Sequence, residues 1–116
     1  MTDFPIDQTA MLGGLRLHYR EWPNPGAQAL VLLHGFTGHA RSWESFARAM
    51  QTKYHVYALD QRGHGDSDWA EDYSATAMVE DAQRLVTALG LKRFVLLGLS
   101  MGGRNAYQFA ATYPEE

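Results

Sequence analysis

The sequence FVLLGLSMGG, residues 94–103, places a short apolar run directly before a Gly-x-Ser-x-Gly pattern. The run predicts a buried strand and the residues after the pattern predict a helix, so Ser100 is expected on a sharp turn between them. Such a turn strains the backbone of Ser100, and a Cβ at Gly98 or Gly102 would collide with neighbouring backbone. The helix N-terminus would direct its N–H groups toward whatever binds Ser100. These features predict that Ser100 is a nucleophile; the alternative is a glycine-rich turn whose serine caps a helix.

The rest of the chain alternates short apolar runs with amphipathic segments, which is typical of an α/β fold. Residues 15–21 predict a half-solvated strand after a Gly-Gly turn, and residues 1–10 predict a loose lead-in or a weak strand. Buried strands are expected over residues 29–33, 55–59 and 94–97. Three helices are expected: one after Ser42, one after Ser74, and a third over residues 102–113. This order predicts a mostly parallel sheet with an N-terminal antiparallel hairpin and helices on both faces.

The same periodicities predict which side chains are buried. Alternation over residues 15–21 turns His18 toward solvent. Helical spacing after Ser42 predicts that four side chains of that helix face the core, namely Trp43, Phe46, Ala47 and Met50.

Composition restricts the classes of protein to which this chain can belong. With 116 residues, 46% apolar and 20% charged, the chain is neither disordered nor fibrous and fits one domain or part of one. A net charge of −3 argues against nucleic-acid binding. The absence of cysteine excludes a disulfide framework, a thiolate metal site and a cysteine nucleophile. No apolar run approaches the roughly 20 residues of a membrane span, and no signal peptide is evident. The sequence therefore predicts a cytoplasmic protein that does not bind membranes.

Loops are expected at the carboxyl ends of the buried strands, where parallel sheets form their sites. The tripeptide His34-Gly35-Phe36 follows the first of these strands. The backbone N–H groups of Phe36 and Met101 are expected to stabilise the oxyanion that forms when Ser100 attacks a carbonyl. His34 is expected to brace its loop rather than to take part in catalysis, because it precedes Ser100 in the chain.

The loop after the second buried strand reads DQRGHGDS over residues 60–67. Gly63 and Gly65 allow a tight fold, and a local hydrogen-bond network is expected among Asp60, Arg62 and His64. The glycine spacing matches neither a dinucleotide-binding nor a phosphate-binding loop. Asp66 and Asp68 lack the spacing of an EF-hand and are expected in solvent, so the sequence predicts no metal site.

Three motifs, in this order and on these elements, resemble those of the α/β-hydrolase fold family: HGF at 34–36, DQRGHGDS at 60–67 and GLSMGG at 98–103. The resemblance identifies residues 1–116 as a partial domain of that fold, the N-terminal portion through the nucleophile elbow and its helix. It implies a serine hydrolase of the esterase, C–C hydrolase and perhydrolase branch, without a cofactor. Epoxide hydrolases and haloalkane dehalogenases carry aspartate where this chain has Ser100, so the resemblance disfavours them.

The residues that would complete a catalytic triad are missing from the sequence. The family order places an acid and then a histidine after the serine, yet no histidine follows Ser100 and the acids there are Glu115 and Glu116. The chain is therefore expected to be a fragment, nearly inert alone, of an enzyme that hydrolyses small ester-like substrates with an apolar acyl group. The alternative is a non-catalytic half-domain, an interaction module completed by a second chain. Residues 94–97 would then form an exposed apolar sheet edge, which also favours self-association.

Overall fold

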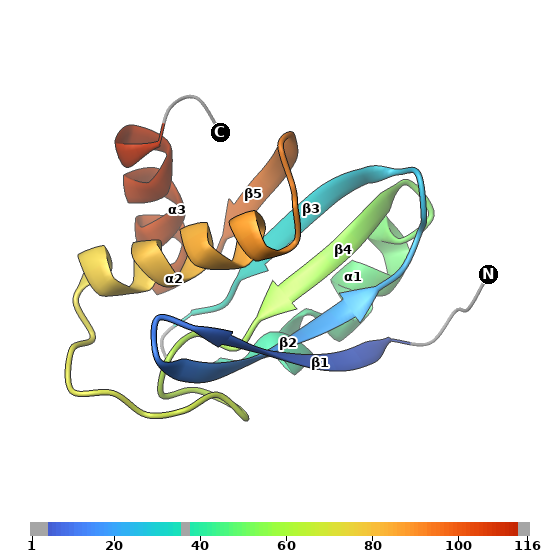
Figure 1. Cartoon of the computed structure of the whole chain (residues 1–116). Coiled ribbons are helices and arrows are strands. Elements are labelled where there is room, and N and C mark those ends of the chain that lie inside the picture. Colours follow the sequence, from blue (N-terminus) through green and yellow to red (C-terminus); the bar gives the residue numbers. More distant parts are fainter. Residues whose placement is uncertain (1–4, 36–37, 114–116) are drawn as a thin grey trace.

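A five-stranded sheet forms the centre of the computed structural model, which describes residues 5–35 and 38–113. The elements in chain order are β1 (Ile6–Leu12), β2 (Leu15–Trp22), β3 (Gln28–Leu33), the 3₁₀ turn η1 (Ala40–Trp43), α1 (Glu44–Met50), β4 (Tyr54–Leu59), α2 (Ala75–Ala88), β5 (Phe94–Gly98) and α3 (Met101–Thr112). Across the sheet the strands lie in the order β1-β2-β4-β3-β5 (Figure 1). β2 pairs antiparallel with β1 and β4, whereas β3 runs parallel to β4 and β5. The predicted hairpin and parallel core are confirmed, although β1 is a seven-residue strand rather than a loose lead-in.

Helices cover both faces of this sheet, as the sequence predicted. Figure 1 shows α2 and α3 on one face and α1 on the other. Successive residues of a strand point to opposite faces, so Val31 and Leu33 pack in the core beneath α2 and α3, while Leu30 and Leu32 pack in the core beneath α1. The carboxyl ends of β3, β4 and β5 consequently meet at one edge of a sheet whose strands are packed on both sides.

The two helices predicted to follow a serine cap begin differently. Ser74 caps α2 by accepting the N–H of the residue three positions later at 3.1 Å. Ser42 does not cap α1, because η1 intervenes and α1 begins at Glu44. The prediction that Phe46 is buried is wrong, since its side chain is 39% exposed. The tighter winding of a 3₁₀ turn rotates the following residues relative to a helix that starts at Ser42. Within the described residues, no helix combines the length and the apolar character needed to cross a membrane.

One edge of the sheet is formed by β5, which pairs with β3 and with no other strand in the described part of the chain. Phe94 and Leu96 pack against the core beneath α2 and α3. On the opposite face, Val95 is 39% and Leu97 38% exposed. The predicted exposed apolar edge is therefore present, and it leads directly into the turn that carries Ser100.

Candidate active site

The turn between β5 and α3 holds Ser100 in an unusual backbone conformation. Its φ of 56° and ψ of −114° make it the only non-glycine residue with positive φ in the described ranges. Side chains rarely adopt such angles, which cost about 1–3 kcal/mol and persist only where surrounding structure imposes them. Ser100 is exposed, immediately before the N-terminus of α3. This is the strained, outward-facing serine that the sequence pattern predicted.

Two glycines allow the backbones around Ser100 to approach closely. A Cβ on Gly98 would overlap the carbonyl of Gly102, and a Cβ on Gly102 would overlap the carbonyl of Leu33 and lie 2.7 Å from that of His34. All these neighbours are main-chain atoms, which cannot rotate away. The steric requirement predicted from the sequence is therefore met, and it packs α3 tightly against the end of β3.

One backbone N–H group without a hydrogen-bond partner among the described residues directly follows Ser100. The N–H of Met101, the first residue of α3, makes no hydrogen bond within the part of the chain that the structure describes. The loop after β3 lies against the same turn, because a Cβ on Gly35 would be 3.6 Å from the Cβ of Ser100. Phe36, the second predicted donor, lies outside the described residues, so its role stays a prediction.

His34 fixes the start of that loop. Its Nε2 accepts the N–H of Gln61 at 3.0 Å, and its Nδ1 lies 2.7 Å from the carbonyl of Gly35. Because a carbonyl only accepts, Nδ1 carries the proton and Nε2 is the acceptor. Burial lowers the pKa of His34, an effect that its bond to the carbonyl of Gly35 only partly offsets. With both nitrogens engaged, His34 is built as a brace and not as a free base for Ser100.

The lowered pKa of His34 predicts a loss of stability in acid. In the folded chain the ring resists protonation, whereas in the unfolded chain it titrates near the ordinary value of 6.5. Below about pH 6.5 the unfolded chain therefore binds more protons than the folded chain. The stability that His34 contributes above this pH is lost as the pH falls through the lowered pKa of the folded chain. We expect the urea midpoint to fall more steeply between pH 7 and 5 for wild type than for His34→Asn. Equal slopes in the two proteins would contradict this expectation.

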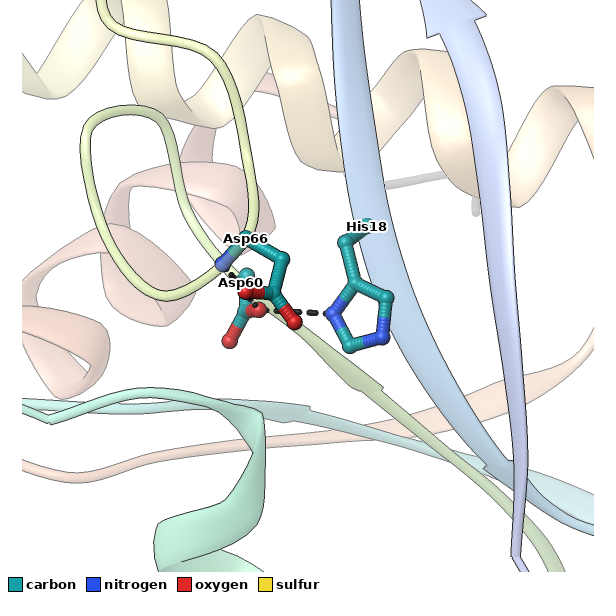
Figure 2. Close-up of side chains that lie close together, drawn as sticks. All are labelled: His18, Asp60 and Asp66. Atoms are coloured by element: carbon teal, nitrogen blue, oxygen red, sulfur yellow. Dashed lines mark hydrogen bonds and ion pairs between the residues drawn. The ribbon is translucent and has the colours of Figure 1, made fainter.

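The carboxylate of Asp60 anchors three other segments near the site. Its Oδ2 lies 2.6 Å from Nδ1 of His18 and accepts the N–H of Asp66 at 2.9 Å, while Oδ1 accepts the N–H of Ala40. Figure 2 shows the contact between Asp60 and His18. The prediction that His18 faces solvent is wrong, because it is 4% exposed and its Nε2 lies 2.9 Å from Asp7. Asp60 and Asp7 cover the face of β2 that carries His18, a face that the alternating pattern alone predicts to be exposed to solvent.

The predicted local network of Asp60, Arg62 and His64 is present in part, as a bond between His64 and the main chain of Arg62, whereas the side chain of Arg62 has a different partner. Arg62 turns away to form a two-bond ion pair with Asp81 of α2, at 2.7 and 2.9 Å. The hydrogen bond to that carboxylate raises the pKa of Arg62. Nδ1 of His64 instead lies 2.9 Å from the Arg62 carbonyl, and its ring packs 4.8 Å from that of His34. The loop is thus held by bonds to other elements, with Gly63 and Gly65 at positive φ.

A cation site is the other interpretation of the cluster in Figure 2. His18, Asp60 and Asp66 bring possible ligand atoms within 4.8 Å of one another. His18 and Asp60 are already bonded to each other, and Asp60 also accepts hydrogen bonds from two backbone N–H groups. Asp68, the other acid considered, accepts the N–H of Arg16 at 2.9 Å. A metal ion would have to displace these bonds, so the donor set fits a hydrogen-bonded anchor better than a cation site.

A pocket of about 620 Å³ opens beside Ser100. The loop after β3, the η1–α1 segment and the nucleophile turn line it, and its apolar walls include Trp43, Phe46 and Leu99. Trp43 and Phe46 pack against each other with ring centroids 5.6 Å apart. A reacting group on Ser100 would therefore have an apolar neighbourhood large enough for a small-molecule substituent.

Sequence analysis missed two buried polar residues at the site. Gln61 and Asn105 are 1% and 0% exposed, and they hydrogen-bond to each other at 2.8 Å. Asn105 lies three residues after Gly102 and four before Phe109, all three buried on one face of α3. A polar residue on the buried stripe of a helix is the signal that could have found it.

The sequence of this chain is similar to a family model and to several known proteins. The family model described as alpha/beta hydrolase fold matches residues 28–116. Epoxide hydrolase 4 of Mus musculus is 37% identical over 105 residues, which cover 88% of this chain and 29% of that protein. The sn-1-specific diacylglycerol lipase ABHD11 of Mus musculus is 43% identical over 89 residues, which cover 75% of this chain and 29% of that protein.

Solved structures match the fold over nearly the whole chain. A membrane phospholipase A, described as a bacterial virulence factor, superposes with a TM-score of 0.93 at 33% identity. The match covers 97% of this chain and 37% of that one. The chain therefore spans about a third of the length of these relatives.

Proposed function

We propose that this chain, which belongs to the alpha/beta hydrolase fold family, carries the nucleophile of a serine hydrolase acting on carboxylic esters or related acyl compounds. The observation that carries the proposal is the backbone of Ser100, whose strained angles hold an exposed hydroxyl at the start of α3. Strain of this kind is retained where function requires a side chain to be displayed. A simple helix cap would need neither the positive φ nor the close packing of Gly98 and Gly102.

The proposed chemistry is nucleophilic acyl transfer. The Ser100 oxygen forms a bond to the carbonyl carbon, and the carbonyl electron pair moves onto oxygen. The N–H of Met101, and by expectation that of Phe36, stabilises this oxyanion until the leaving alkoxide departs. The Ser100 hydroxyl makes no cap hydrogen bond at the start of α3, and the base that takes its proton is expected from the family order to be a histidine that follows the serine in the complete protein. Hydrolysis of the acyl-enzyme by water then restores Ser100.

The pocket and the nucleophile together favour esters with an apolar substituent. Trp43, Phe46 and Leu99 supply the apolar walls beside Ser100. Among the relatives, the one named as a diacylglycerol lipase fits this substrate class. An epoxide hydrolase is also similar to this chain, but the serine at position 100 favours acyl transfer over the aspartate chemistry that the family resemblance implies for epoxide hydrolases.

Covalent labelling of the 116-residue chain tests the nucleophile without requiring turnover. An alkyl fluorophosphonate at pH 9, where hydroxide can accept the serine proton, should phosphonylate Ser100 with loss of fluoride. Mass spectrometry should find the adduct on Ser100 in wild type and in Ser45→Ala, a control in the same pocket, and no adduct in Ser100→Ala. Equal modification of the Ser100→Ala variant would overturn the proposal.

The edge strand β5 supports self-association as a second proposed property. Its exposed Val95 and Leu97 and its unpaired outer side would allow a second copy to extend the sheet. We expect dimers of wild type at micromolar concentration in light scattering, and monomers of Leu97→Lys. Met11→Lys, which alters a residue that is 68% exposed at the opposite edge, should still dimerise. A wild-type chain that is folded and monomeric would contradict this proposal and with it the interaction-module alternative.

A further inference from the structure

The side chain of Gln61 lies between the loop after β3 and the helix that follows Ser100. Its Nε2 donates to the carbonyl of His34 at 2.9 Å, and its own backbone N–H donates to Nε2 of His34 at 3.0 Å. On the other side, its Oε1 accepts from Nδ2 of Asn105 at 2.8 Å. Asn105 lies five residues after Ser100, on the same helix. One side chain thus bonds both segments that the proposed reaction requires.

The direction of these bonds is fixed by chemistry. The carbonyl of His34 can only accept, so the NH₂ end of Gln61 must face it. That leaves the amide oxygen of Gln61 to face Asn105, whose NH₂ group is the donor. Both side chains are almost fully buried, at 1% and 0% exposure, so water cannot replace a lost partner. Neither a carboxylate at position 61 nor one at position 105 can make the same set of bonds.

We infer that Gln61 is a positioning residue that sets the distance between the oxyanion loop and the nucleophile turn, an inference that rests on the proposed function. Oxyanion donors act only when they lie within a few tenths of an ångström of the developing charge, and a misplacement of 1 Å can cost about 10²-fold in rate. Met101 is the first residue of α3, and Phe36, the second expected donor, follows His34 and Gly35 in the chain. Gln61 connects the start of the loop after β3 to α3 through its hydrogen bonds to His34 and Asn105.

Two isosteric variants of the 116-residue chain break the connection at different points. Gln61→Glu replaces the donor to His34 with a carboxylate oxygen and keeps an acceptor for Asn105. Asn105→Asp keeps the bond to His34 and removes the donor to Gln61. The matched control is His55→Asn, which disrupts the partly buried contact with Glu21 at the opposite end of β4 and touches neither segment.

The readouts are the rate at which an alkyl fluorophosphonate labels Ser100 at pH 9 and the ³¹P chemical shift of the adduct. The shift responds to hydrogen bonds on the phosphoryl oxygen, which occupies the place of the oxyanion. Each variant should label roughly 10- to 100-fold more slowly than wild type, and its ³¹P shift should move toward that of the unfolded adduct. His55→Asn should keep the wild-type rate and shift.

Acidification of the preformed adducts adds a rescue that general loosening would not produce. A protonated carboxyl at position 61 or 105 can donate one hydrogen bond and accept another, as the native amide does. The ³¹P shift of Gln61→Glu should therefore return toward wild type between pH 8 and 5. Oδ1 of Asn105 accepts from the Arg104 guanidinium at 3.0 and 3.2 Å, so the carboxylate of Asn105→Asp should stay charged and show no return over the same range. Should both variants fail to fold, Gln61→Met, which has a similar length and no charge, replaces them in the rate measurement.

The outcomes separate this inference from the proposed function. Wild-type chain that is not labelled at Ser100 overturns both. Wild type that is labelled, together with folded variants of unchanged rate and ³¹P shift, overturns only the positioning role of Gln61. Equal slowing in His55→Asn also overturns it, because the effect would then follow stability rather than the bonds of Gln61.

Discussion

Replacing Gly102 by alanine is expected to lower the free energy of unfolding by more than about 3 kcal/mol, enough to remove the cooperative transition of a small chain. The added methyl would overlap the carbonyl of Leu33 and lie 2.7 Å from that of His34. Both carbonyls are backbone at the end of β3 and cannot rotate aside. The first turn of α3 would have to leave the sheet, and Ser100 would leave its strained conformation with it. Urea denaturation followed by circular dichroism measures the loss.

Gly103 provides a matched control one residue further along α3. A Cβ there would lie 3.3 Å from the carbonyl oxygen of Gly98, a tight but adjustable contact. Alanine is favoured over glycine in a helix interior by about 1 kcal/mol, which offsets that crowding. Gly103→Ala should therefore retain nearly wild-type stability. Wild-type stability in Gly102→Ala would mean that the close approach of α3 to β3 is not required.

The sequence predicted those parts of the fold whose signals are local. The apolar run over residues 94–97 and the glycine pattern after it are adjacent in the chain, so strand, turn and helix could be placed together. Ser74 was identified as a cap because its acceptor lies three residues before its donor. The start of α1 was missed, since a 3₁₀ turn and an α-helix over residues 40–50 have the same apolar residues and differ only in winding.

The parts of the site that could not be predicted depend on contacts between distant segments. His18 lies on an alternating strand, and nothing within that strand indicates that Asp7 and Asp60 will bury it. Arg62 was paired with its neighbours in the loop, whereas its partner Asp81 is 19 residues away on α2. Periodicity gives the face of an element and not the element that covers it. Polar side chains on covered faces, such as Asn105, are therefore the hardest to interpret from sequence alone.

Replacing Asp81 by alanine is expected to cost about 3–5 kcal/mol, because it leaves a buried cation without its counter-ion. Asp81 is 1% and Arg62 8% exposed, and two hydrogen bonds at 2.7 and 2.9 Å join them. Arg62 stays charged at all working pH values, so it cannot avoid the penalty by losing its proton. Only its bond to the carbonyl of Asp72 at 2.8 Å would remain in the loop. Thermal and urea unfolding of the variant measure the cost.

Two further variants identify the origin of that cost. Arg48→Ala removes the exposed helical pair with Glu44, leaves the bond of Glu44 to Arg20 in place, and should change stability by less than about 1 kcal/mol. Arg62→Met combined with Asp81→Leu removes both buried charges and should recover most of the stability lost in Asp81→Ala, since apolar groups of similar volume often replace a buried ion pair without loss. A double variant as unstable as Asp81→Ala would contradict the unpaired-charge account. The bond of Arg62 to Asp72, and with it the conformation of the loop before α2, would then carry the stabilisation instead.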